Sequence, residues 1–170
     1  MAEEKIEAYP SGKLFWQGKE YRCAIGKSGV TSQKKEGDGA TPIGCFPIRE
    51  VFYRIDKVKL PALPFLVREL KPDDGWCDDI NDPNYNKFVK IPYPASHEKL
   101  WREDNLYDIV VVLGYNDNPP VPGLGSAIFM HVARPEFTPT DGCIALDKSD
   151  LIEILSTATN ETLVCVNDTG

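Results

Sequence analysis

The stretch GSAIFMH at residues 125–131 is an apolar run that ends in a histidine, and TDGCIAL at residues 140–146 presents a cysteine after a glycine at the head of a second apolar run. A loop that contains two prolines joins the two stretches. This pattern predicts neighbouring elements that carry the thiol of Cys143 and the imidazole of His131. A thiol and an imidazole held by neighbouring elements are the minimum equipment for nucleophilic catalysis.

Length and composition limit the classes of protein to consider. The 170 residues fit a single domain, 1–170, that is large enough to bury its own core. Hydrophobic residues make up 42% of the chain and charged residues 26%, which argues against global disorder. The net charge of -7 disfavours nucleic acid as a partner and gives no attraction to an anionic membrane surface. The purest aliphatic run, Ile109–Leu113, is far too short to span a membrane.

The N-terminal sequence bears on the expected compartment. Met1–Lys5 has neither the basic start nor the apolar segment of a secretory signal. The sequence as written therefore predicts a cytoplasmic protein, or a periplasmic one if a signal had been removed and replaced by Met1.

The five cysteines do not follow a recognisable framework. Their number is odd and no C-x-x-C pair exists, so neither a disulfide framework nor a zinc knuckle is expected. Cys23 and Cys165 lie in strand-like runs, where a cysteine is typically a small buried apolar side chain. Cys45 and Cys77 have no base near them in the sequence.

The first two thirds of the chain alternate short apolar runs with turns. Residues 14–16 and 21–25 flank a glycine-containing loop and predict a β-hairpin. Residues 34–48 are rich in glycine and proline and predict a turn-rich connection into a strand near Phe46. The acid-rich residues 73–82 do not have EF-hand spacing and predict a solvated loop. Residues 96–102 predict a short helix capped by their first residue, a serine.

The last third predicts most of the regular structure. Residues 108–113 form a β-branched run typical of a strand buried on both faces, and 127–131 predict the next strand. Residues 147–155 open with acids and continue with a helical apolar pattern. Residues 162–166 predict a final strand. The fold class that follows is a mostly-β sandwich or barrel-like domain with one main helix after Cys143.

The candidate catalytic residues are Cys143, His131 and Gly142. An unperturbed thiol has a pKa of roughly 8.5, so it needs a base or a positive charge to act as a nucleophile. The chain has only two histidines, His97 and His131, which leaves few candidate bases. Gly142 permits a tight turn and close approach of substrate. The N–H groups of Gly142 and Cys143 are then candidates for an oxyanion hole.

Three stretches resemble a known family. GATPIGCFPI at residues 39–48 resembles the strand entry T-P-x-G-x-F-x-I of YkuD-like L,D-transpeptidase domains. Residues 128–131 resemble the family's strand-borne histidine, and residues 140–146 resemble its nucleophile loop S/T-H-G-C-[IV]-R-[LM]. The order of the three motifs also agrees, so the chain resembles a divergent branch of that family.

Two positions depart from the family pattern. Asp141 stands where the family usually has a histidine, and Ala145 stands where it usually has an arginine. Arg134, three residues after His131, is a candidate to replace the missing charge. These departures bear mainly on which acceptor, an amine or water, would take the acyl group in the reaction that the resemblance implies.

The resemblance implies acyl transfer on a peptidoglycan stem peptide or muropeptide. Cys143 would attack the carbonyl on the L-centre of the diamino acid at position three, and the terminal D-alanine would leave to give a thioester. An amine would then complete an L,D-transpeptidation with 3→3 crosslinking, or water an L,D-carboxypeptidation. His131 would act as base and then acid, and no metal or organic cofactor would be needed. The cytoplasmic expectation favours water and trimming of tetrapeptides to tripeptides.

Two further classes compete with this interpretation. A catalytically silent wall-fragment binding module would keep the groove while Asp141 and Ala145 mark lost activity. A papain-like protease is weaker, since such enzymes place their cysteine before their histidine. The residues considered as substrate contacts are His97, Tyr115, Asn116, Arg134, Thr140 and Asp141.

Overall fold

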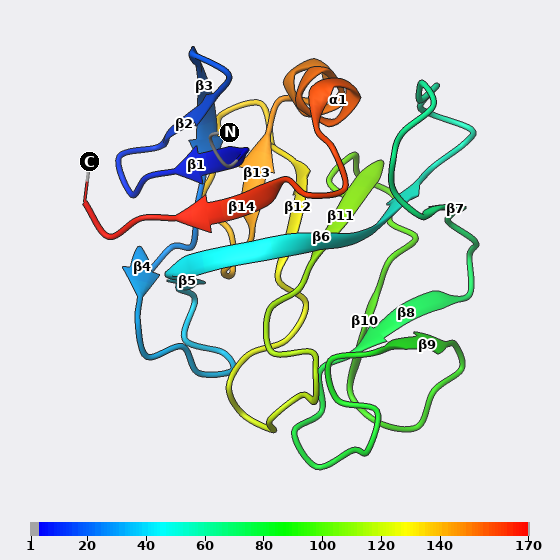
Figure 1. Cartoon of the computed structure of the whole chain (residues 1–170). Coiled ribbons are helices and arrows are strands. Elements are labelled where there is room, and N and C mark those ends of the chain that lie inside the picture. Colours follow the sequence, from blue (N-terminus) through cyan, green and yellow to red (C-terminus); the bar gives the residue numbers. More distant parts are fainter. Residues whose placement is uncertain (1–3, 170) are drawn as a thin grey trace.

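The computed structural model describes residues 4–169, so Met1–Glu3, on which part of the signal-sequence argument rests, lie outside the described residues. A nine-stranded sheet has the order β11-β12-β13-β3-β2-β1-β14-β6-β7 (Figure 1). Because β6 pairs with β11 as well as with β14, the sheet closes into a barrel and β7 lies at its side. The predicted fold class, mostly β and barrel-like, is confirmed.

The strands of the large sheet are short, apart from β6. They are β1 (Lys5–Ala8), β2 (Lys13–Trp16), β3 (Lys19–Ala24), β6 (Gly44–Tyr53), β7 (Val67–Glu69), β11 (Ile109–Leu113), β12 (Phe129–Val132), β13 (Ile144–Leu146) and β14 (Leu163–Val166). Two smaller sheets stand apart, β10 (His97–Lys99)-β8 (Asp74–Cys77)-β9 (Phe88–Lys90) and β4 (Val30–Thr31)-β5 (Thr41–Pro42). One helix, α1 (Lys148–Thr157), occurs within residues 4–169.

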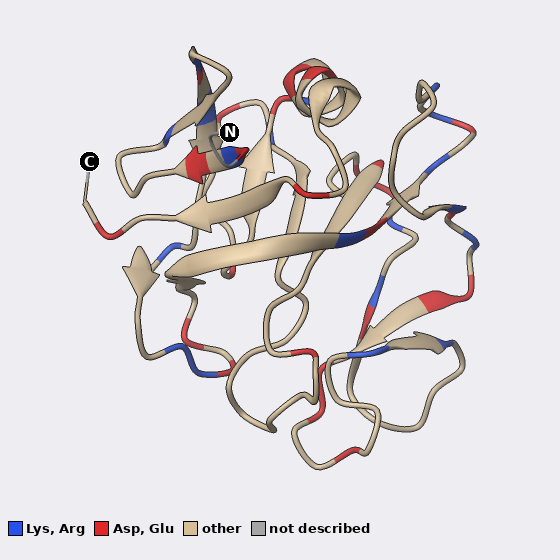
Figure 2. Ribbon diagram, viewed as in Figure 1, with Lys and Arg blue, Asp and Glu red and all other residues tan. Residues whose placement is uncertain are grey.

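Strand β11 separates two apolar clusters, as its β-branched sequence predicts. Ile109, Val111 and Leu113 pack into the larger core, which also receives the buried face of α1. Val110 and Val112 point to a second cluster that includes Phe129, Tyr107 and Cys143. Figure 2 shows that β11, β12 and β13 carry no charged residue, which fits strands covered on both faces.

Local sequence signals explain two of the elements. The β2–β3 hairpin turns through Gln17 and Gly18, whose φ angles of 49° and 76° are those of a tight hairpin turn with two left-handed residues. Helix α1 begins after Asp147, whose carboxylate accepts hydrogen bonds from the N–H groups of Ser149 and Asp150. Both predictions are confirmed.

Two predictions between residues 70 and 102 are wrong. Residues 97–99 form strand β10 instead of a helix, because they pair with β8, and Ser96 Oγ donates to Asp78 at 2.7 Å instead of capping a helix. Residues 74–77 of the expected solvated loop form β8, which is fully buried. The charge of Asp74 is accommodated there by Lys90 at 2.5 Å.

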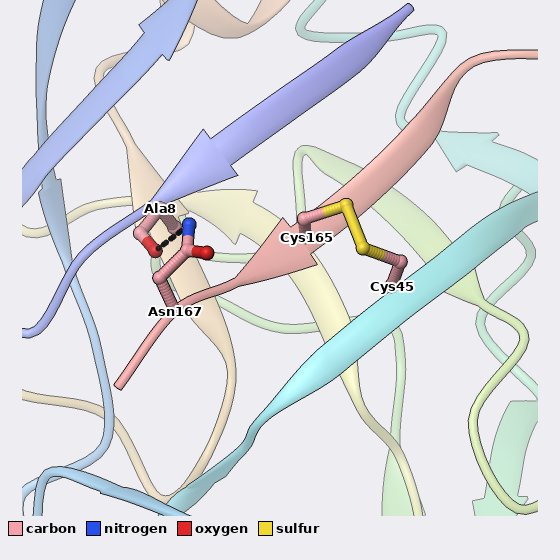
Figure 3. Close-up of a disulfide and its surroundings, with 4 residues drawn as sticks. All are labelled: Ala8, Cys45, Cys165 and Asn167. Carbon is pink, nitrogen blue, oxygen red and sulfur yellow. Dashed lines mark hydrogen bonds between the residues drawn. A yellow bond between two sulfur atoms is a disulfide. The ribbon is translucent and has the colours of Figure 1, made fainter. Parts of the chain in front are cut away.

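The expectation that no disulfide forms is also wrong. Cys45 on β6 and Cys165 on β14 stand directly opposite each other in an antiparallel pair, with their Cα atoms 4.0 Å apart, and form a disulfide (Figure 3). Beside it, Asn167 donates from Nδ2 to the carbonyl of Ala8 on β1. The bond joins positions 120 residues apart, so the end of the chain is fastened into the barrel.

No helix among the described residues is long and apolar enough to cross a membrane.

Candidate active site

Strands β12 and β13 bring Cys143 and His131 to one cavity. The strands run parallel, with His131 paired to Ala145, and Cys143 immediately precedes β13. Cys143, Ala145 and His131 all line a cavity of about 550 Å³. The sequence therefore predicted correctly that these neighbouring elements bring a thiol and an imidazole together.

The cavity wall is strongly polar and carries both signs of charge. Its basic residues are Lys27, Lys34, Arg102 and Arg134, and its acidic residues are Glu36, Asp78, Glu98 and Asp141. Such a wall suits a ligand that carries both a positive and a negative charge better than it suits an apolar ligand.

The thiol of Cys143 is held by two backbone groups. Sγ donates to the carbonyl of Ala127 at 3.2 Å and accepts from the N–H of Phe129 at 3.4 Å. Burial raises the pKa of the thiol to about 12, with a smaller contribution from the nearby charge of Glu98. The resting side chain is therefore a neutral thiol that needs a base to become a nucleophile.

The imidazole of His131 is placed to act as a base. Nδ1 lies 2.9 Å from the carbonyl of Val132, which only accepts hydrogen bonds, so the proton belongs on Nδ1 and Nε2 carries a lone pair. Burial lowers the pKa of His131 to about 4, against the opposing effect of the Val132 hydrogen bond. The ring of Tyr107 packs edge-on at 5.3 Å and helps to fix the imidazole.

The turn before the thiol is fixed by Thr140. Its Oγ1 donates to the carbonyl of Cys143 at 2.7 Å and accepts from the N–H of Gly142 at 3.1 Å. The Gly142 N–H is thus engaged, which corrects the prediction that it belongs to an oxyanion hole with the N–H of Cys143. Gly142 has φ 137°, and a Cβ atom there would lie 2.8 Å from the carbonyl oxygen of Ala40.

This geometry makes Gly142 a demanding position. We expect Gly142→Ala to lower the free energy of unfolding by about 1–3 kcal/mol beyond the backbone strain of a positive φ, because its Cβ would clash with the carbonyl oxygen of Ala40, and to abolish most turnover by displacing Cys143. Gly29→Ala is the matched control, because Gly29 also has a positive φ, 80°, but open space around its Cβ position. Urea unfolding and turnover of both variants check this, and equal behaviour of the two would contradict it.

The structure brings four of the six predicted substrate contacts to the cavity and leaves two outside it. His97, Arg134, Thr140 and Asp141 line the cavity with the Cys–His pair. Tyr115 and Asn116 do not line it.

These two residues instead brace their own loop. Tyr115 donates from its hydroxyl to the carbonyl of Leu124 at 2.5 Å. Asn116 donates from Nδ2 to the carbonyls of Val121 and Gly125. They were predicted from their place along the chain before β12, which did not reveal that their side chains turn back onto the loop.

Two of the predicted contacts carry charges that already have partners. Asp141 is exposed and lies 3.2 Å from Lys27. Arg134 lies 3.9 Å from Asp104, which Arg102 holds more closely, at 2.6 Å. Arg134 is therefore in the cavity but shares its charge with another carboxylate.

Sequence reasoning missed Asn86, which holds Ala127, the residue whose carbonyl accepts the hydrogen bond from the Cys143 thiol. Its buried Oδ1 accepts from Trp76 Nε1 at 2.9 Å and from the N–H of Ala127 at 3.0 Å, while Nδ2 donates to the carbonyls of Tyr115 and Asn116. Ala127 has φ 55°, an unusual value for alanine, and this network holds it there. An asparagine in a loop gives no signal of such a role in a single sequence.

Sequence reasoning also missed a partly buried acid, Glu98, beside the pair. Tyr107 donates from its hydroxyl to Glu98, and both residues line the cavity. Burial raises the pKa of the Glu98 carboxyl and raises that of Tyr107 well above its ordinary value. The guanidinium of Arg102 stacks on the Tyr107 ring at 5.2 Å and brings a positive charge near this acid.

Within residues 4–169, no group of three or more His, Cys, Asp and Glu side chains is arranged to hold a metal ion.

The barrel and its cavity define a domain in which the thiol of Cys143 and the imidazoles of His131 and His97 line the same cavity. The family model of the L,D-transpeptidase catalytic domain, YkuD, matches residues 2–166. The chain therefore belongs to the YkuD family of L,D-transpeptidase catalytic domains. No curated protein matches the sequence.

Three solved structures illustrate the similarity. An L,D-transpeptidase from Mycobacterium smegmatis is 13% identical, with a TM-score of 0.43, and the match covers 98% of this chain and 59% of that one. L,D-transpeptidase 3 from Mycobacterium tuberculosis, solved with a faropenem-derived adduct, is 13% identical, with a TM-score of 0.44, and the match covers 97% and 60%. The helical cell shape determining protein Pgp2 from Campylobacter jejuni is 15% identical, with a TM-score of 0.41, and the match covers 99% and 48%. The chain thus spans about half to three fifths of the length of these structures.

Proposed function

We propose that the protein is a cysteine-dependent acyltransferase that acts on peptidoglycan stem peptides. The observation that carries this is the placement of a buried thiol and a neutral imidazole with a free Nε2 on one cavity wall. Membership of the L,D-transpeptidase family supports the substrate class. A cavity with both acidic and basic side chains also suits a diamino dicarboxylic residue at position three, whose side chain keeps an ammonium and a carboxylate outside the peptide bonds.

The first half of the reaction forms a thioester. Cys143 Sγ attacks the carbonyl on the L-centre of the third residue while His131 Nε2 takes the thiol proton. The bond to the terminal D-alanine then breaks, and the imidazolium returns its proton to the leaving amine. For this the thiol must turn from the carbonyl of Ala127, its partner in the resting structure, toward His131.

The second half depends on the acceptor. Water would give an L,D-carboxypeptidase, which was favoured by the cytoplasmic expectation. Disulfides are rare in the cytosol and common in oxidising compartments, so the Cys45–Cys165 bond supports a location outside the cytoplasm. Crosslinking acceptors are dense there, and we therefore infer that an amine resolves the thioester, which makes L,D-transpeptidation the main outcome.

Product analysis tests this choice. Purified enzyme is incubated with a disaccharide-tetrapeptide, and products are followed by liquid chromatography and mass spectrometry. Crosslinked dimers with release of D-alanine are expected. Tripeptide and free D-alanine without dimers would show instead that water is the acceptor.

A muropeptide-binding module without activity is the second candidate. The observation that favours it is the thiol hydrogen bond to Ala127 instead of to His131, together with Asp141 and Ala145 at positions where the family usually has other residues. Intact-protein mass spectrometry after incubation with a carbapenem separates the two candidates. A covalent adduct on Cys143 supports the enzyme, and muropeptide binding without any adduct supports the binding module.

A further inference from the structure

Lys34 is a buried cation at the catalytic cavity. The residue is 7% exposed and lines the same cavity as Cys143 and His131. Its Nζ lies 2.5 Å from Asp38 Oδ1, and Asp38 also accepts from the N–H groups of Lys35 and Ala40. Burial of a lysine is costly unless its charge is paired, and Asp38 supplies the paired charge.

The ammonium of Lys34 lies beside the turn that presents the nucleophile. The position that a Cβ atom of residue 142 would occupy is 3.3 Å from Lys34 Nζ. The same position at Gly125 is 3.0 Å from Lys34 Cγ. Two glycines on two different segments thus leave room for this one side chain, and the lysine is packed against both of them.

The hydrogen bonding of the ammonium is incomplete. An ammonium has three N–H donors, and within residues 4–169 Asp38 is its one hydrogen-bond acceptor. The other N–H groups of the Lys34 ammonium have no acceptor among the described residues, although Lys34 is buried and lines the cavity. A substrate oxygen that enters the cavity would satisfy them.

The nucleophile turn lacks a donor that the reaction needs. As Cys143 attacks a carbonyl, negative charge develops on the carbonyl oxygen, and an oxyanion hole normally supplies two donors to it. The N–H of Gly142 is already bound to Thr140 Oγ1 at 3.1 Å. A donor other than this N–H is therefore required beside the N–H of Cys143.

We propose that Lys34 is a further catalytic residue, whose ammonium donates a hydrogen bond to the oxyanion of the tetrahedral intermediate formed on Cys143. This inference rests on the proposed acyl-transfer function. Lys34 transfers no proton in this step: the S–C bond forms while His131 takes the thiol proton, the carbonyl oxygen becomes negative and accepts a hydrogen bond from Lys34, and the carbonyl re-forms as the amine leaves with the proton from His131. Asp38 holds the ammonium in place.

The test compares two reactions of the same thiol. Acylation of Cys143 by a carbapenem passes through an oxyanion, whereas alkylation by iodoacetamide does not. We expect Lys34→Met to lower the maximal acylation rate on the order of 100-fold, as loss of one oxyanion donor does, while alkylation changes only a few-fold and the half-saturating carbapenem concentration stays nearly constant. The control is Lys35→Met, at an exposed neighbouring lysine outside the cavity, with both rates unchanged.

Other results would overturn the assignment. Equal losses in acylation and alkylation would show that Lys34 acts on the thiolate instead of the oxyanion. If the half-saturating carbapenem concentration rises while the maximal acylation rate is unchanged, Lys34 binds a substrate carboxylate instead. If Lys34→Met leaves Asp38 unpaired and does not fold, the double variant Lys34→Met with Asp38→Asn removes both charges and is measured in its place.

The wild-type protein separates failure of this inference from failure of the proposed function. A wild type that is acylated on Cys143, with variants acylated just as fast, rejects the role of Lys34 alone. A wild type that is alkylated but never acylated rejects the acyltransferase function, and the role of Lys34 with it.

Discussion

Cys143→Ala is expected to abolish turnover of a disaccharide-tetrapeptide, with activity falling to the background of the uncatalysed reaction. Without Sγ no thioester forms, and no other free thiol lines the cavity among the described residues. Cys143→Ser is expected to be nearly as inactive, because a buried hydroxyl is harder still to deprotonate than this thiol. Both variants should keep the fold, since the position tolerates a small side chain.

The other free cysteines provide the controls. Cys23 is buried away from the cavity, and burial raises its pKa to about 12. Cys77 on β8 donates to Asp82 at 3.5 Å. Cys23→Ala and Cys77→Ser are expected to retain activity, measured by the same product assay with circular dichroism as the check on folding. A folded Cys77→Ser without turnover would mean that Cys143 is the wrong nucleophile.

The disulfide cysteines do not belong among these controls. Replacing Cys45 or Cys165 removes a cross-link of 120 residues, and such a loss typically costs about 2–5 kcal/mol of stability in small secreted domains. Reduced activity in those variants would report unfolding and not chemistry.

The sequence predicts the parts of this fold that local patterns determine. The hairpin at Gln17–Gly18, the doubly buried β11 and the helix capped by Asp147 each depend on residues within a few positions of one another. The motif around Cys143 and the strand that ends near His131 are of the same kind. Such signals survive in a single sequence because the interactions that cause them are short-range.

The errors come from contacts between distant segments. Ser96 has the chemistry of a helix cap, but it donates to Asp78 because β10 pairs with β8. The acid-rich sequence around Asp74 predicts a solvated side chain, but Lys90 on the adjacent strand pairs with the carboxylate and allows its burial. The register that places Cys45 opposite Cys165 is equally invisible before the barrel is known.

The residues of the candidate site also divide into those that local motifs predict and those that only contacts between distant segments place. The proposed nucleophile and base lie in motifs, whereas Lys34 and Glu98 line the cavity from two other segments, and Asn86 on a third segment contacts the cavity-lining residue Ala127. Their roles depend on burial, since each is an ordinary polar residue until water is excluded around it. No spacing in the chain connects them to Cys143.

His131→Ala is expected to lower kcat/KM for the stem peptide by two or more orders of magnitude, the typical worth of a general base. The thiol pKa of about 12 leaves almost no thiolate at neutral pH, so attack by Cys143 depends on a base that accepts its proton. The variant is checked by stopped-flow or quenched acylation with a carbapenem. Normal acylation rates in a folded His131→Ala protein would remove His131 from the mechanism.

The pH dependence of the same reaction gives an independent check. Burial lowers the folded-state pKa of His131 to about 4, so the acylation rate should stay level below pH 6.5 and fall only as the pH drops through about 4. Between pH 6.5 and 4 the unfolded chain binds a proton that the folded chain excludes, so stability falls on acidification, by roughly 3 kcal/mol from this residue. In His131→Ala the pH dependence of stability that comes from this residue should be absent. In His97→Gln the acylation rate should still fall as the pH drops through about 4, whatever the change in KM. A wild-type midpoint near 6.5 would mean that the imidazole is solvated during the reaction and that the buried geometry is not the active one.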